Sequence, residues 1–211
     1  MKKLIKELVK EGYLKTKIII EAFNKINRED FVPESLQEEA YLNMPLVIGH
    51  GQTISQPLTI AFMLELLQPR EGEKILDIGS GSGYVTALLS YIVGEKGKIY
   101  AIERVSELKK MGEYNADKYN FVKKGIAKFF YGDGSRGLPD KMPFDKIHIA
   151  AAGREIPIAL KEQLKIGGKL VMPIGGLDQD LVLLEKKGKN KFKERHYPGF
   201  SFVPLITDLH N

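Results

Sequence analysis

The sequence predicts an α/β protein with a doubly wound, mostly parallel seven-stranded sheet, an antiparallel hairpin at its C-terminal end and a helical extension at its N-terminus. Three observations predict this fold. From residue 74 onward, short apolar runs alternate with segments of helical periodicity, the pattern of strands joined by crossover helices. A glycine-rich turn follows the first apolar run. The last two runs, 180–186 and 192–206, have no helix between them, so we expect them to pair as a hairpin.

The N-terminal part is predicted to be mostly helical. Apolar residues in 18–26 recur at helical spacing and form one stripe. Pro33 is suited to the first turn of a further helix running through Tyr41. The polar stretch GHGQTISQP (49–57) then leads directly into the apolar pattern of a helix at 58–67. We expect a single domain, with residues 1–57 as the extension and 58–211 as the α/β core.

The core elements follow from the same alternation. Strands are expected at 74–78, 98–102, 127–131, 144–150 and 169–174, and helices at 84–93, 104–119 and 155–164. The pair Gly167-Gly168 is expected to end the last of these helices.

Composition excludes several classes of site. The chain has no cysteine, which rules out disulfides, thiolate metal ligands and a cysteine nucleophile. Its four histidines are scattered, so no metal site is expected. The apolar residues of the first 14 positions have helical spacing interrupted by acids, and no segment resembles a signal peptide or a membrane span. We therefore expect a cytoplasmic protein without a membrane partner.

The formal charge of +5 raises the question of a nucleic-acid partner. Much of it comes from lysines and an arginine in 186–195, where only Phe192 and Tyr197 are near enough to stack on bases. We interpret this stretch as a solvated turn and expect no nucleic-acid partner.

The stretch LDIGSGSGY (76–84) carries the most chemical information. Gly79, Gly81 and Gly83 allow a sharp turn and a close approach of a ligand at the carboxyl ends of the strands. A dinucleotide fingerprint has its third glycine where this chain has Tyr84, which argues against a nicotinamide-dependent oxidoreductase. Asp77, at the mouth of the turn, would repel a pyrophosphate but attract a cation, such as the ammonium and sulfonium of S-adenosylmethionine.

Acids also end the next two strands. Glu103 is placed to accept hydrogen bonds from both hydroxyls of a ribose. Asp133, flanked by Gly132 and Gly134, is placed to accept one from an adenine amino group. A single such acid is often only a cap or a turn residue, but three successive strand ends with acids favour a binding site.

With these residues the chain resembles the protein-L-isoaspartate O-methyltransferases, which are class I S-adenosylmethionine-dependent methyltransferases with a Rossmann-like sheet. The resemblance extends over most of the chain, and the glycine turn marks only the superfamily. The more specific motifs are GQTISQP (51–57) and EIP (155–157), supported by YAIER (100–104), YGDG (131–134), PFDKIHIAAA (143–152), QLKIGGKLVMPIG (163–175) and FVPL (202–205). His148 and Ala150 depart from the pattern, where valine or threonine is expected. We interpret His148 and His50 as structural.

The resemblance implies methyl transfer from S-adenosylmethionine to the free carboxylate of L-isoaspartyl residues in damaged proteins and peptides, which begins their repair to aspartate. The product would be S-adenosyl-L-homocysteine, and the partners would be isoaspartyl-containing proteins, bound by a monomer or a small homo-oligomer. The loop before residue 58 would contact substrate through Thr53, Ile54 and Ser55, with Ser55 also the catalytic candidate. Cofactor contacts are expected from Asp77, Gly79, Ser80, Gly81, Ser82, Gly83, Glu103, Asp133, Gly134 and Thr207, and no metal is expected.

Other interpretations remain open at this point. Thr53 or Ser55 could simply cap the helix that follows Pro57. Another methyltransferase, acting on RNA or a small molecule, is the main alternative. AAAGREIP stands after the fourth strand, where enzymes that methylate exocyclic amines of RNA bases carry an Asn/Asp-Pro-Pro-Tyr motif. A module that binds the cofactor without catalysis is a further alternative.

Overall fold

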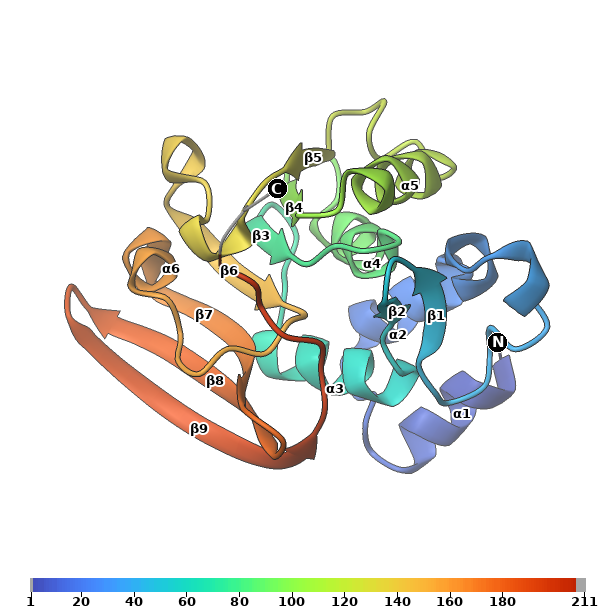
Figure 1. Ribbon diagram of the computed structural model, residues 1–211, viewed down its shortest axis with the longest axis horizontal. Coiled ribbons are helices and arrows are strands. Elements are labelled where there is room, and N and C mark those ends of the chain that lie inside the picture. The colour runs from blue at the N-terminus through green and yellow to red at the C-terminus, as the bar shows by residue number, and fades with distance from the viewer. Residues whose placement is uncertain (1, 208–211) are drawn as a thin grey trace.

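The computed structural model describes residues 2–207, and its main sheet has seven strands in the order β5-β4-β3-β6-β7-β8-β9 (Figure 1). The parallel strands are β3 (Lys74–Ile78), β4 (Lys98–Glu103), β5 (Ala127–Tyr131), β6 (Phe144–Ile149) and β7 (Leu164–Gly175). The last two, β8 (Gln179–Gly188) and β9 (Lys191–Phe200), form an antiparallel hairpin against β7. The chain order reverses between β3 and β6, so the predicted doubly wound sheet is confirmed.

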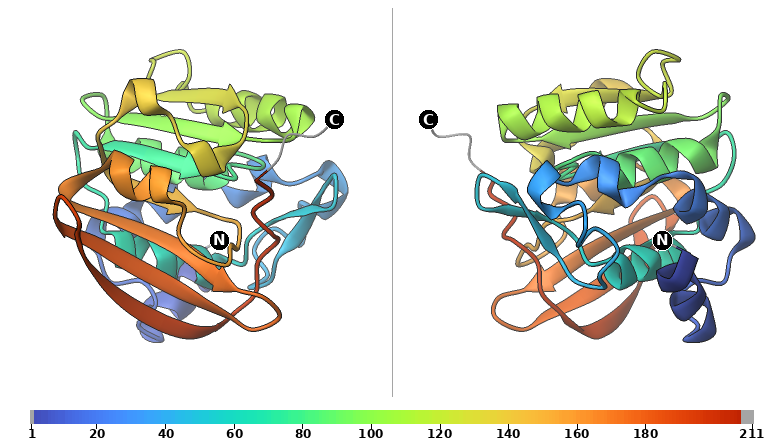
Figure 2. Two further views of the ribbon diagram at one scale, coloured as in Figure 1. Left: turned by 60° about the vertical axis from the view of Figure 1, so that its left-hand side comes forward. Right: turned by 90° about the vertical axis from the view of Figure 1, so that its right-hand side faces the viewer.

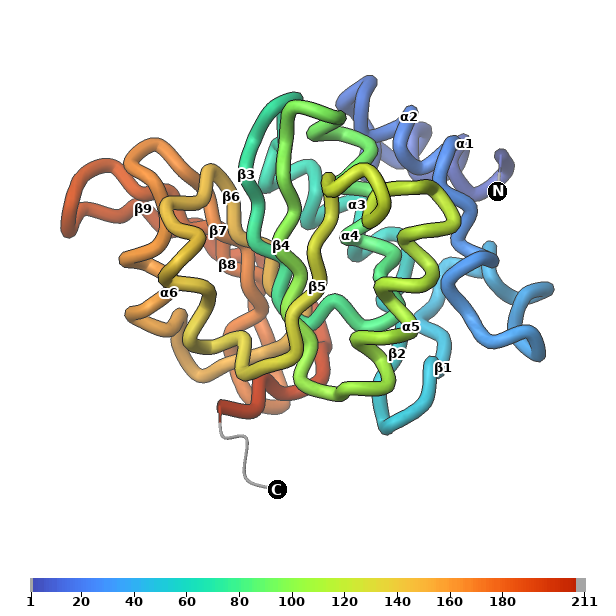
Figure 3. Tube along the Cα trace, turned by 90° about the horizontal axis from the view of Figure 1, so that it is seen from above, coloured from blue at the N-terminus to red at the C-terminus, as the bar shows by residue number. Residues whose placement is uncertain are grey.

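Helices cover both faces of this sheet. The helices α3 (Pro57–Leu67), α4 (Tyr84–Val93) and α5 (Ser106–Asp117) lie on one face, and α6 (Ile158–Gln163) lies on the other (Figure 3). Because both faces are covered, β3 and β6 are almost entirely buried. The crevice for a ligand is therefore expected where β3 and β6 end.

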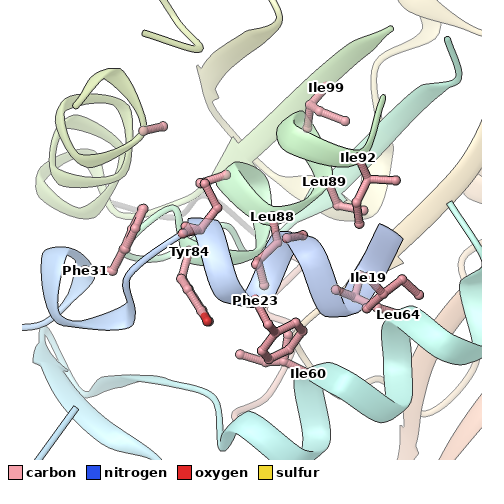
Figure 4. Close-up of a cluster of buried hydrophobic side chains, with 14 of the residues drawn as sticks. Ile19, Phe23, Phe31, Ile60, Leu64, Tyr84, Leu88, Leu89, Ile92 and Ile99 are labelled. Carbon is pink, nitrogen blue, oxygen red and sulfur yellow. The ribbon is translucent and has the colours of Figure 1, made fainter. Parts of the chain in front are cut away.

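The N-terminal extension packs onto the same core. It begins with α1 (Lys2–Lys10) and α2 (Lys17–Lys25). The predicted apolar stripe is confirmed: Ile19 and Phe23 are buried and face α3 and α4 (Figure 4). The Glu65 carboxylate of α3 accepts the backbone N–H groups of Lys15 and Thr16, each at 2.7 Å, and so holds the first turn of α2. The extension and the sheet share one hydrophobic cluster.

Two predictions for the N-terminal part are wrong. The helix expected from Pro33 to Tyr41 is reduced to the 3-10 turn Glu34–Leu36, preceded by another at Arg28–Phe31. Ala40 is the one fully buried residue of that stretch, and residues 34, 35 and 37–39 are exposed, which leaves too little apolar contact to hold a longer helix. The stretch expected to be a loop instead contains a two-stranded hairpin, β1 (Leu46–Gly49) and β2 (Gln52–Ile54).

The remaining differences concern element ends. Helix α6 starts at Ile158 instead of residue 155, because Pro157 disfavours helical geometry in the residue before it. Strand β7 begins at Leu164 and passes through both glycines that were expected to end a helix. Strand β9 ends at Phe200, and the following segment makes only an isolated bridge from Pro204. Within residues 2–207, no helix has the length and apolar character to cross a membrane.

Candidate active site

A cavity opens at the carboxyl ends of β3, β4 and β6, and its open space, counted out into bulk solvent, is about 880 Å³. Its floor is formed by residues 78–82, 102–104, 132, 134, 150 and 151. The segment 46–56, here called the strap, covers it with residues 52–55, and residues 203–206 form a side wall. Figure 2 shows the C-terminal segment running beside the β1–β2 hairpin.

The three glycines of the predicted loop all have positive φ angles, 75° at Gly79, 50° at Gly81 and 85° at Gly83. Gly79 and Gly81 line the cavity. Gly83 lies outside the lining, and a Cβ there would come 2.5 Å from the carbonyl oxygen of Gly112. Gly83 therefore lets α4 approach α5 closely, and the structure gives no contact between it and the cavity.

Polar groups of the floor are left available to a ligand. Ser80 and Ser82 line the cavity, and the Ser80 hydroxyl is buried without a hydrogen-bond partner among the described residues. The Glu103 carboxylate also lines the cavity and is only 6% exposed. It accepts the N–H groups of Gly81 at 2.9 Å and Val105 at 3.0 Å, so it holds the loop while keeping lone pairs for further donors.

Asp133 lies just behind the cavity wall. Its neighbours Gly132 and Gly134 line the cavity, and Gly132 faces open space. One oxygen of Asp133 accepts the Ser135 N–H at 2.8 Å, which caps a 3-10 turn. The other oxygen, Oδ2, is buried without a hydrogen-bond partner among residues 2–207, and it lies 3.6 Å from Nε of the exposed Arg136 in a long ion pair. The capping role that the sequence left open is thus observed, and the second oxygen remains available.

The structure corrects the expected environment of Asp77. This carboxylate is fully buried and does not line the cavity. It accepts a hydrogen bond from the Thr86 hydroxyl of α4, and it pairs with Nδ1 of His148, its neighbour in register on β6, at 2.8 Å. Both oxygens already have hydrogen-bond partners beneath the loop, so this arrangement gives Asp77 no direct contact with a cofactor ammonium. The negative charge still lies under the cavity floor.

Tyr84 stands where a dinucleotide fingerprint has glycine, and its ring fills the space between the loop and the N-terminal extension. It packs against Phe31 at 5.3 Å and Phe23 at 6.3 Å between ring centroids (Figure 4). Complete burial raises the pKa of its hydroxyl. Tyr84 also contributes to the cavity lining, which connects the extension to the site.

The strap places its predicted residues at the cavity. Thr53, Ile54 and Ser55 all line it. The alternative in which Thr53 or Ser55 caps α3 is wrong. The N-cap is Gln56, and the Leu58 N–H is accepted by the side chain of Asn43 at 3.0 Å.

Sequence reasoning missed most of the side wall. Val203 and Leu205 exchange backbone hydrogen bonds with Ala152, at 2.8 and 2.7 Å. Gln179 binds both the N–H and the carbonyl of Phe202, at 2.7 and 3.1 Å. Thr207, predicted as a cofactor contact, is exposed and follows the last lining residue without lining the cavity itself.

A second groove joins the cavity under the strap and shares Thr53, Ser55, Ala150 and Val203 with it. One wall is aromatic, with the Phe62 ring 5.3 Å from Tyr197 and 5.4 Å from Phe200 between centroids. Asp178 is the only charged residue among those described that line the groove. The groove therefore offers a ligand mainly ring surfaces and a single carboxylate.

The model of the Protein-L-isoaspartate(D-aspartate) O-methyltransferase (PCMT) family matches residues 1–210. The chain belongs to this family. Proteins named protein-L-isoaspartate O-methyltransferase are similar to it over almost its full length. The one from Ignicoccus hospitalis is 45% identical over 98% of this chain and 97% of its own, and the one from Methanopyrus kandleri 40% identical over 98% and 91%.

A solved structure agrees with this family membership. A Plasmodium falciparum protein described as a member of the same methyltransferase group superposes with a TM-score of 0.85, at 25% identity and with 98% of both chains covered. That protein was crystallised with S-adenosyl-L-homocysteine. The resemblance predicted from the sequence motifs is confirmed.

Proposed function

We propose that this chain transfers the methyl group of S-adenosylmethionine to the free carboxylate of L-isoaspartyl residues in damaged proteins and peptides. One observation carries the proposal: Ser55 lies where the cavity at the strand ends meets the groove with the aromatic wall. A methyl donor in the cavity and a peptide in the groove would meet at this residue. The reaction type is inferred from membership of the family, and its location is inferred from this junction.

The floor of the cavity fits the donor in its chemistry. We infer that the Glu103 carboxylate accepts from the ribose hydroxyls, and that the second oxygen of Asp133, which has only a long ion pair with Arg136, accepts from the adenine amino group. The unpartnered Ser80 hydroxyl is available to the methionine part. Asp77 contributes a buried negative charge beneath a cationic ligand without touching it. When bound, the donor supplies an electrophilic methyl group on a positively charged sulfur.

The acceptor needs orientation more than activation. A carboxyl with a pKa near 4 is already ionised at neutral pH, so no general base is required. The groove offers no lysine or arginine among its described lining residues, so a carboxylate there would not be held in a strong ion pair that lowers its nucleophilicity. We infer that the Ser55 hydroxyl and strap N–H groups orient it in line with the methyl group.

The groove also bears on the kind of substrate. Its wall of Phe62, Tyr197 and Phe200 presents ring surfaces rather than charges, so it favours main chain and apolar side chains of an extended segment. We infer that flexible or unfolded segments are methylated, with little dependence on neighbouring charge. A chain without cysteine needs no oxidising compartment, which agrees with work in the cytoplasm.

The test uses radiolabelled S-adenosylmethionine and two peptides that differ only in carrying isoaspartate or aspartate. Base-labile label on the isoaspartyl peptide alone is expected, and label on RNA or on neither peptide would refute the proposal. In Ser55→Ala, loss of one hydrogen bond to a charged acceptor should lower kcat/KM by about 10- to 100-fold. Affinity for S-adenosyl-L-homocysteine should stay within twofold or so. The matched control is Ser201→Ala, at an exposed serine that lines the groove but not the cavity.

A further inference from the structure

A buried arginine lies directly behind the strap. The Arg28 side chain is only 1% exposed and lines neither the cavity nor the groove. Its guanidinium donates to the carbonyl oxygens of Ala40 at 2.6 Å, Met44 at 3.2 Å, Ile54 at 3.4 Å and Ser55 at 3.1 Å. No carboxylate lies within ion-pair distance of it among the described residues. Two of the four acceptors belong to the strap.

Burying a charged guanidinium in this way destabilises the fold relative to an apolar side chain. Burial lowers the pKa of Arg28 to about 10, because a charge removed from water loses its hydration. Four carbonyl dipoles replace that hydration only in part, and its Nε has no hydrogen-bond partner among residues 2–207. An apolar side chain in the same space would avoid this cost. The planar fork of guanidinium donors, however, fixes several carbonyls at once.

The base of Arg28 is itself held in place. It begins the 3-10 turn Arg28–Phe31, whose preceding residue Asn27 donates its N–H to the Tyr119 hydroxyl at 2.8 Å. The rings of Phe31 and Tyr119 stack at 5.9 Å between centroids. Arg28 therefore connects the strap to a turn that is anchored close to α5.

The direction of the two strap carbonyls determines where the neighbouring N–H groups point. The only cis peptide bond in the described chain is at Met142–Pro143, so the strap peptides are trans. In a trans peptide the carbonyl and the N–H point in opposite directions. Because the Ile54 and Ser55 carbonyls face Arg28, the N–H groups of Ser55 and Gln56 point away from it. Neither N–H donates a hydrogen bond within residues 2–207.

We propose that Arg28 is a positioning residue that fixes the strap from behind, so that the Ser55 hydroxyl and the N–H groups of Ser55 and Gln56 form a preset donor group for the acceptor carboxylate. This proposal rests on the proposed function of Ser55. The guanidinium never touches substrate, and it acts by setting the direction of two consecutive peptide dipoles. Without it the strap keeps its sequence but loses its fixed orientation.

The variants for the test are Arg28→Met and Arg28→Lys, with Lys186→Met as the matched control. Lys186 is also a buried cation whose hydrogen bonds all go to carbonyls, those of Lys161, Glu162 and Leu164 at 2.7, 3.1 and 2.7 Å, with the Phe192 ring centroid at 5.9 Å. Lys186 belongs to β8, its ammonium reaches the C-terminal end of α6, and it lines neither the cavity nor the groove. Its loss should therefore lower thermal stability as Arg28→Met does, without altering the strap.

Steady-state kinetics with an isoaspartyl peptide should separate the two positions. We expect Arg28→Met to lower kcat/KM by about 10- to 100-fold, as misplacement of an orienting group does, while affinity for S-adenosyl-L-homocysteine stays within roughly twofold. Arg28→Lys keeps the charge but loses the planar fork of donors, so its kcat/KM should lie between those of the parent and Arg28→Met. This variant replaces Arg28→Met in the test if Arg28→Met does not fold. Kinetic constants for Lys186→Met should stay within about twofold of the parent. Unchanged kinetics in both Arg28 variants would overturn the proposal, as would an equal loss of S-adenosyl-L-homocysteine affinity.

Hydrogen exchange gives a readout that does not depend on activity. Amides of residues 51–56 should exchange faster in the Arg28 variants, and those of residues 76–84 should not change. If the parent protein methylates no isoaspartyl peptide, the proposed function fails, but the exchange comparison still decides whether Arg28 holds the strap. Equal exchange at residues 51–56 in the parent and in both variants would refute the positioning role.

Discussion

Replacing Asp77 tests whether this residue supports the cavity floor or binds the ligand directly. In Asp77→Ala, the Thr86 hydroxyl and Nδ1 of His148 lose their common acceptor in a place that water does not reach. A hydrogen bond to a charged group contributes about 1.5–3 kcal/mol, so two of them put the loss at roughly 3–6 kcal/mol. For a domain of this size that lowers Tm by about 10 °C.

Asp77→Asn is the informative second variant. An amide has the same shape, accepts from one partner through its oxygen, and donates through its nitrogen to His148 once that ring moves its proton to Nε2. The Nε2 atom is buried and has no hydrogen-bond partner among the described residues, so a proton there would remain unbonded. We expect Asp77→Asn to cost about 1–2 kcal/mol. Ser90→Ala, which removes a buried α4 hydroxyl bonded to the Thr86 carbonyl, is the control for general damage to the helix.

The assay is urea unfolding with and without S-adenosyl-L-homocysteine. A ligand at 100 times its Kd adds about 2.7 kcal/mol to the stability of any variant that still binds it with full affinity. If Asp77 acts through the fold, the alanine variant has a lower baseline but gains nearly the same increment from the ligand. A variant with an almost normal baseline and no increment would refute this reasoning, because it would show Asp77 in direct contact with the ligand.

Further predictions concern packing, the loop and pH. Gly83→Ala should cost about 3 kcal/mol in urea unfolding, because it combines a left-handed φ with overlap against the Gly112 carbonyl. Glu103→Gln should weaken S-adenosyl-L-homocysteine binding in calorimetry by about tenfold, since an amide accepts fewer of the loop and ribose donors. Burial raises the pKa of Asp145, but hydrogen bonds from Lys165 and the backbone outweigh it, so the net pKa lies below its ordinary value. The Tm advantage over Asp145→Asn should therefore be complete above about pH 4 and disappear as the pH falls through the lowered pKa; an advantage that grows in acid would contradict this.

The parts of the site that were predictable lie at strand ends. An apolar run followed by Gly79, Gly81 and Gly83 defines a turn by local chemistry alone, and Glu103 follows from the end of the next run. The structure places these residues together because parallel strands present their carboxyl ends at one edge. Sequence reasoning is dependable here because each element is specified by residues within a short window.

The direction of Asp77 was not predicted, although the signal was present. Successive side chains of a strand point to opposite faces, so Asp77 shares a face with Ile75, which packs against the helices. It also neighbours His148 once β6 pairs with β3. Proximity to the glycine turn suggested a ligand contact, whereas the alternation of side chains along β3, together with a histidine on the neighbouring strand β6, indicates a buried pair. That histidine departs from the family pattern, which is a reason to seek its partner.

The strap hairpin was missed for a different reason. Its turn places Gly49, His50 and Gly51 at φ angles of 92°, 53° and 68°. Because Gly49 pairs with Gln52, the loop is His50-Gly51, and two central residues with positive φ are the pattern of a type I′ turn. The dipeptide His-Gly is not among the Asn-Gly, Asp-Gly and Gly-Gly pairs that usually indicate this turn. His50, which had no counterpart in the family pattern, is a turn residue in this unusual conformation. The strand partners β1 and β2 are also only a few residues long, below what periodicity can detect.

The walls of the cavity come from three distant parts of the chain, and a buried polar side chain holds the main chain of each. Arg28 donates to carbonyls of the strap, and Glu103 accepts N–H groups in and near the glycine loop. Gln179 binds the backbone N–H and carbonyl of Phe202, the residue that precedes the side wall. Each wall is irregular backbone that the sheet cannot order by itself, so its polar groups need side-chain partners. Of the three holders, only Glu103 was predicted, and it was predicted as a ligand contact. A pattern in sequence identifies residues that face a ligand more readily than residues that hold the backbone around it, because the latter bind main chain of any sequence.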